Sequence, residues 1–272
     1  MAQHAKGIKW YIIIAFAISW ASLLLINVLH IPLPESTAGM TAASGPLMLL
    51  GMLATFGPAI AATVVRKWIT REGFADAGLS LNLRGGWKYY LAALLFPLIV
   101  VPVAVLAGAV TGARPDLSVL ATLVPLLIGG LVAGLMYFGE EFGWRAYLQD
   151  RVAPGKPLLA ALWTGLVWGI WHWPYVFLGL TMGGNLLGLL FYVVDSAMGS
   201  IFLGWLRTKG KSVWPAALAH GVGNMAVSGA MTALFPGMSE LTWGVLAMVG
   251  YAVLALLLVL SGQVKSREAA AT

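Results

Sequence analysis

The chain has 272 residues, of which 10% are charged and 60% are hydrophobic. An average soluble domain carries roughly 25% charged residues, and a water-soluble protein needs them to cover its surface. The composition therefore excludes a soluble enzyme, a secreted domain and a disordered chain, and it predicts an integral membrane protein. Because the sequence has no cysteine, it also excludes a disulfide framework, a thiol nucleophile and a thiolate metal site.

Apolar stretches long enough to cross about 30 Å of hydrocarbon as helices occur throughout the chain. They lie at about residues 8–30, 46–65, 88–112, 118–138, 158–178, 184–206, 213–234 and 241–261. None shows the period-2 alternation of a barrel strand, so the predicted fold is an all-α multi-pass membrane protein of about eight helices. The first stretch is not followed by a small-residue cleavage site, which predicts an uncleaved anchor.

The 16 basic residues predict the orientation. With eight spans, all of them except Arg114 fall on one side of the membrane, and Lys and Arg concentrate in cytoplasmic loops. We therefore expect a cell-membrane protein with both termini in the cytoplasm. The net charge of +6 then reflects topology and contacts with anionic membrane lipid, and no nucleic-acid partner is expected. The opposite loops, at 31–45, 113–117, 179–183 and 235–240, are too short to form a domain.

Polar residues inside membrane helices are costly, so each is a functional candidate. They gather in the fourth to seventh spans and comprise Glu140, Glu141, Arg145, His172, Asp195, His220 and Asn224. Trp168 is added as the aromatic residue four positions before His172. Residues four apart share a helix face, so Glu141 is expected to pair with Arg145, while Glu140, turned by about 100°, is left free. By the same spacing, Trp168 and His172 project together, as do His220 and Asn224. Three helices thus aim a carboxylate, two imidazoles and an amide at one point.

Small residues four apart also predict close packing of these helices. Such ridges occur in the fourth, fifth and sixth spans, as Gly130 with Gly134, Gly165 with Gly169, and Ser196 with Ser200 and Gly204.

This set of side chains suits hydrolysis of an amide bond. A carboxylate beside a neutral imidazole activates water, while a second imidazole and an amide N–H₂ stabilise an oxyanion. Alternatively, Glu140, His172 and His220 hold Zn²⁺ with water in the fourth position. No His-Glu-x-x-His motif, Gly-x-Ser-Gly motif or paired-aspartate motif of other intramembrane proteases is present.

The three motifs Glu-Glu-x-x-x-Arg, aromatic-x-x-x-His and His-x-x-x-Asn occur in this order on successive predicted helices. In this respect the chain resembles the CPBP intramembrane protease family, which includes the Rce1-type CAAX prenyl proteases and bacterial homologues linked to bacteriocin immunity. The resemblance covers roughly residues 118–235. It divides the chain into N-terminal helices (1–113), a protease core (114–236) and a last helix with a cytoplasmic tail (237–272).

The resemblance implies a membrane peptidase whose active site lies in a conical cavity between the fourth and seventh spans. Glu140 would activate water that His172 shares, His220 and Asn224 would form the oxyanion site, and Glu141 with Arg145 would be structural or orient the substrate. Trp168 stands where the eukaryotic-type motif has Phe and is expected to line the cavity. Asp195 is either a hydrogen-bond acceptor for a histidine or a partner of a serine or backbone group. Whether the mechanism uses a metal stays open.

Two functions of other classes remain as alternatives. Paired acids and histidines in membrane helices also form proton relays of transporters, although the spans show no repeated halves. A non-catalytic membrane scaffold, such as an immunity or regulatory protein, is the second. The substrate, a lipidated C-terminal tail or a transmembrane peptide, and the oligomeric state are not predicted by the sequence.

Overall fold

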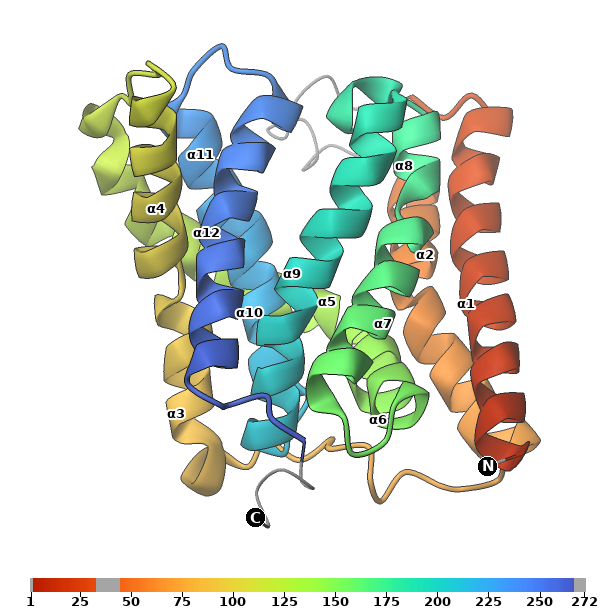
Figure 1. The fold of residues 1–272 in the computed structure, drawn as a ribbon. Helices are drawn as coiled ribbons and strands as arrows, with labels where there is room; N and C mark the ends of the chain where they lie inside the picture. Colours follow the sequence, from red (N-terminus) through yellow and green to blue (C-terminus); the bar gives the residue numbers. More distant parts are fainter. Residues whose placement is uncertain (1, 33–44, 267–272) are drawn as a thin grey trace.

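The computed structural model describes residues 2–32 and 45–266, and this part of the chain is helical and contains no strand. It therefore supports the predicted all-α fold. Most of the expected loop 31–45 and Arg267, one of the basic residues used to predict orientation, lie outside the described residues. The beginning of α1 and the end of α12 lie at the same end of the bundle (Figure 1).

The described chain is built almost wholly of helices (Figure 1). In chain order they are α1 (Ala2–Val28), α2 (Gly45–Val64), α3 (Leu83–Leu95), α4 (Pro97–Val110), α5 (Leu123–Gly143), α6 (Gln149–Val152), α7 (Pro157–Trp171), α8 (Trp173–Phe177), α9 (Leu186–Gly210), α10 (Trp214–Val222), α11 (Ser228–Leu234) and α12 (Glu240–Leu260). Three π-helical segments, η2 (Val65–Ile69), η4 (Trp144–Leu148) and η6 (Gly223–Val227), continue α2, α5 and α10. Two 3₁₀ segments, η3 (Leu117–Thr122) and η5 (Met182–Gly184), precede α5 and α9.

Six helices of the described chain are long and apolar enough to cross a membrane. They correspond to all of the eight predicted spans except the fifth and the seventh, so the count of eight is not confirmed. The fifth stretch divides into α7 and α8, because Pro174 lacks the N–H that would bond the carbonyl four residues earlier. The seventh is continuous through α10, η6 and α11, but it carries the polar residues His220 and Asn224.

The predicted small-residue ridges bring the central helices into close contact. A Cβ atom on Gly165 or Gly169 of α7 would lie 2.5 Å or 2.6 Å from the Cα atoms of Ala197 and Val193 in α9. On α5, a Cβ on Gly130 would lie 2.8 Å from Val222 Cα. Backbones this close hold α7 against α9 and α5 against α10, and these four helices carry most of the candidate residues.

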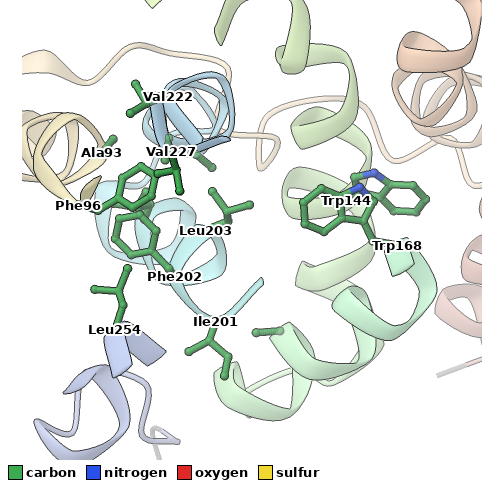
Figure 2. Close-up of a cluster of buried hydrophobic side chains, with 14 of the residues drawn as sticks. Ala93, Phe96, Trp144, Trp168, Ile201, Phe202, Leu203, Val222, Val227 and Leu254 are labelled. Atoms are coloured by element: carbon green, nitrogen blue, oxygen red, sulfur yellow. The ribbon is translucent and has the colours of Figure 1, made fainter. Parts of the chain in front are cut away.

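Aromatic residues fill much of the buried core, and Figure 2 shows part of it. Phe96 of α4's N-terminal boundary packs against Phe202 of α9, with ring centroids 5.1 Å apart. Trp144 and Trp168 belong to the same core cluster and are almost completely buried. The candidate residues around Trp168 therefore lie against a packed apolar interior rather than at the surface of the bundle.

Arginines anchor the segment between α2 and α3 at the end of the bundle where α1 begins. Arg66 bonds Asp76 at 2.7 Å, and Arg151 reaches Asp76 at 3.0 Å and Glu72 at 3.1 Å. Arg207 donates to the backbone carbonyl of Asp76. Burial alone would raise the pKa of Asp76, but the hydrogen bond and charge of Arg66, with the charge of Arg151, lower it to about 2.

Candidate active site

The candidate residues come together from three stretches of the bundle. Glu140 and Glu141 occupy the last turn of α5, and Arg145 follows in η4. Trp168 and His172 lie at the end of α7, while His220 lies in α10. The side chains of Glu140, Glu141, Arg145 and His220 are all buried. Buried polar groups require partners, and most of these find them within the cluster, whereas Glu141 Oε2 and Arg145 Nε have none in the described part of the chain.

Glu141 is the centre of a buried ionic chain. The predicted pair with Arg145 forms, with Arg145 Nη1 donating to Glu141 Oε1 at 3.0 Å. The same carboxylate oxygen lies 2.9 Å from His220 Nδ1. The guanidinium also donates through Nη2 to Ser200 Oγ of α9 at 2.9 Å. Glu141 and Arg145 therefore connect α5, α9 and α10 and fix the position of His220.

Glu140 has a partner that the helical spacing did not predict. The indole Nε1–H of Trp168 donates to Glu140 Oε2 at 2.8 Å in a buried hydrogen bond. Glu140 is thus not wholly free. Its second oxygen, Oε1, has no partner within the described part of the chain and remains able to accept a proton.

The hydrogen bonds of the two histidines define which nitrogen carries the proton. His172 Nδ1 lies 2.9 Å from the carbonyl oxygen of Trp168, which can only accept, so Nδ1 carries the hydrogen. His220 Nδ1 likewise donates to the Glu141 carboxylate. In their neutral forms both imidazoles therefore present an Nε2 lone pair. His172 is further held by stacking on Tyr192, with ring centroids 4.5 Å apart.

Asn224 joins the cluster through a residue that the sequence reasoning missed. Asn224 is exposed and lies in η6, and its side chain hydrogen-bonds Tyr137 of α5. Tyr137 stacks on His220 at 4.1 Å, so one tyrosine contacts both predicted oxyanion residues. Tyr137 lies four residues before Glu141 on the same helix face, and this spacing is the sequence signal that could have identified it as a site residue. Ser200 was noted only as a packing residue, although it also holds Arg145.

Asp195 does not hold either imidazole. In the described part of the chain no hydrogen bond connects it to His172 or His220, whose Nδ1 atoms are bonded to Trp168 and Glu141. It lies on α9, the helix that also provides Ser200.

The donor set does not fit Zn²⁺ as the side chains stand. A catalytic zinc site needs three protein ligands directed at one point. Among residues 2–32 and 45–266, no group of three His, Asp or Glu side chains is arranged to hold a metal ion, so Glu140, His172 and His220 do not form such a group.

The predicted conical cavity is not confirmed. One cavity of about 320 Å³ is lined by the end of α1, the residues just after it and the segment after α8, including Asn27, His30 and Leu178. Another, of about 410 Å³, lies between the start of α7 and the end of α12 and includes Lys156 and Lys265. Neither is lined by the candidate residues.

The fold and the buried cluster define a multi-helical membrane protein whose central helices share a carboxylate and histidine site. Residues 118–226 match the family model described as type II CAAX prenyl endopeptidase, Rce1-like. This segment is therefore similar to the CAAX-type proteases that the motifs resemble, and the match supports protease activity. The matched segment runs from η3 into η6 and contains every candidate residue. No curated protein matches the chain.

Proposed function

We propose that the protein is an intramembrane endopeptidase that cleaves a membrane-associated peptide, and that a prenylated C-terminal tail is the substrate class. One observation carries the proposal. Within the segment that matches the protease family, Trp168 donates to one oxygen of Glu140, and the indole ring of the same tryptophan contacts the imidazoles of His172 and His220.

Glu140 is the proposed general base. Its Oε1 accepts a proton from a water molecule as the water oxygen attacks the scissile carbonyl carbon. The neutral His172 presents an Nε2 lone pair, which accepts the second O–H of this water and orients it. Glu140 then returns its proton to the nitrogen of the leaving peptide when the C–N bond breaks. The same carboxylate thus takes the proton from water and delivers it to the leaving nitrogen.

His220 and Asn224 are the proposed oxyanion donors. Because His220 Nδ1 already donates to Glu141, Nε2 can donate only when the ring is an imidazolium. Tyr137 holds His220 and Asn224 together and so fixes the spacing between the two donors.

The experiment that tests the proposal uses the purified chain in liposomes. The substrate is a peptide that ends in a farnesylated cysteine and three further residues, and release of the tripeptide is followed by mass spectrometry. Glu140→Gln keeps the size of the side chain and an oxygen that can accept from Trp168, but it removes the base, so we expect cleavage to fall by at least about 10²-fold. Asn224→Ala should cost about 10²- to 10³-fold if Asn224 is an oxyanion donor.

The matched control is Glu240→Gln. Glu240 also accepts two hydrogen bonds, from Thr181 Oγ1 and the Met182 amide, but it lies in α12 outside the matched segment. This variant should cleave at the wild-type rate. Near-normal cleavage by Glu140→Gln would refute the assigned base. Equal cleavage of the farnesylated peptide and its unprenylated counterpart would refute the substrate class.

A further inference from the structure

Trp168 contacts four of the candidate residues, which come from different segments of the bundle. Its indole N–H donates to Glu140 Oε2 at 2.8 Å, and its carbonyl oxygen accepts from His172 Nδ1 at 2.9 Å. The ring edge meets His220 at a centroid distance of 5.2 Å. The guanidinium carbon of Arg145 lies 4.3 Å from the ring centroid, a cation–π contact. One side chain thus touches residues of α5, η4, α7 and α10.

The indole hydrogen bond determines how the Glu140 carboxylate is presented. A carboxylate that accepts nothing rotates about its terminal bond, which has broad torsional preferences. The donor on Oε2 fixes the carboxylate plane, and because Trp168 is itself buried in the core, the donor cannot move away. Oε1 is then left as the oxygen that meets water. A Phe ring at this position would line the same wall but could not donate.

We infer that Trp168 is a positioning residue, which holds Glu140 Oε2 through its indole N–H so that Oε1 acts as the base. The inference rests on the proposed function and assigns to this tryptophan more than the lining of a cavity. The same hydrogen bond stabilises the ionised carboxylate, since a donor favours the charged form of its acceptor. Trp168 therefore affects both the orientation and the ionisation of the base.

The test is Trp168→Phe, assayed for cleavage of the farnesylated peptide across pH. We expect kcat/KM to fall by roughly 10- to 100-fold at neutral pH, with KM nearly unchanged, because a hydrogen bond to a charged group is lost. The acidic midpoint of the pH–rate profile should rise, because the donor that favours the charged carboxylate is gone. The other titratable or charged groups around Glu140, which all remain in the variant, are Glu141, Arg145, His220, Tyr11, Tyr137 and Tyr175.

Trp171→Phe is the matched control. Trp171 lies in the same helix and is equally buried, but its indole N–H has no hydrogen-bond partner in the described chain. Both substitutions remove the same atoms from the core, so a purely structural role predicts the same loss of thermal stability and the same pH profile for the two variants. Only Trp168→Phe should move the acidic midpoint.

A rescue variant makes the test independent of packing. Trp168→Gln restores an N–H donor without adding an ionisable group, and its acidic midpoint should lie closer to that of the wild type than the midpoint of Trp168→Phe. If the Phe variant does not accumulate, Trp168→Met provides the same comparison without a donor. An acidic midpoint that stays at the wild-type value in the donor-free variant overturns the inference, even when Glu140→Gln is inactive. Full activity of Glu140→Gln would instead overturn the proposed function.

Discussion

Replacing Arg145 by Met tests the ionic chain on which the site is built. Arg145 is completely buried, and its guanidinium is shared between Glu141 Oε1, Ser200 Oγ and the face of Trp168. Met keeps much of the length and all of the apolar stem, but it leaves the Glu141 carboxylate buried beside Glu140 with only His220 to balance it. Removing one partner of a buried ion pair costs about 3–5 kcal/mol, and we expect Arg145→Met to destabilise the fold by this amount.

The measurement is reversible denaturation of the purified variants in detergent micelles, with the free energy of unfolding compared at neutral pH. Arg114→Met is the control, because Arg114 is exposed and has no ion pair in the described part of the chain. It should change stability by less than about 0.5 kcal/mol. The double variant Arg145→Met/Glu141→Gln should recover part of the loss, since the Glu141 carboxylate is no longer left without its guanidinium partner. A cost for Arg145→Met within about 1 kcal/mol of the control would refute the reasoning.

Two further predictions concern packing and pH. A Cβ on Gly169 would lie 2.6 Å from Val193 Cα, which is backbone and cannot move aside, so Gly169→Ala should cost about 1–3 kcal/mol in denaturation experiments. Gly199→Ala, where nothing lies within 4 Å, should be neutral or stabilising by about 0.5–1 kcal/mol, and equal effects of the two substitutions would contradict the close contact of α7 and α9. The pKa of Asp76 is about 2 in the folded chain, below its unfolded value of about 3.9, so its contribution is complete above about pH 4 and is lost as the pH falls toward 2. Because Asp76 is half-exposed, Asp76→Asn should cost only about 1 kcal/mol at neutral pH, and a stability difference from wild type that persists at pH 2 would be evidence against the arginine contacts as its cause.

Hydropathy predicted where the helices are, but not where each one ends. Of the eight predicted spans, six coincide with helices able to cross a membrane, because a long apolar run in lipid can only be helical. The fifth predicted span includes Pro174, and the structure divides this span into α7 and α8. The small-residue ridges were predicted correctly, since glycine spacing records where two backbones meet.

Contacts within one helix were readable from spacing, whereas contacts between helices were not. Glu141 and Arg145 pair as the four-residue spacing predicted. The bonds from Trp168 to Glu140 and from His220 to Glu141 join residues that are 28 and 79 positions apart. Which of two adjacent glutamates meets which partner depends on how α7 and α10 are rotated against α5. A single sequence contains no periodic signal for that rotation.

Two of the motifs run into π-helical segments, and the four-residue spacing predicts the contact correctly in only one of them. A helical wheel assumes α geometry, but Arg145 and Asn224 each lie one residue inside a π-helical segment, η4 and η6. Each segment widens the helix and rotates the side chains that follow it, and such segments are frequent at functional sites. Arg145 still meets Glu141, because both side chains are completely buried and need each other. Asn224 is exposed and carries no charge, so nothing forces it onto His220, and it bonds instead to Tyr137, which stacks on that histidine. Burial and charge therefore enforce the pair of Glu141 and Arg145. Asn224 is connected to His220 only through Tyr137, and this connection can be seen only in the packed structure.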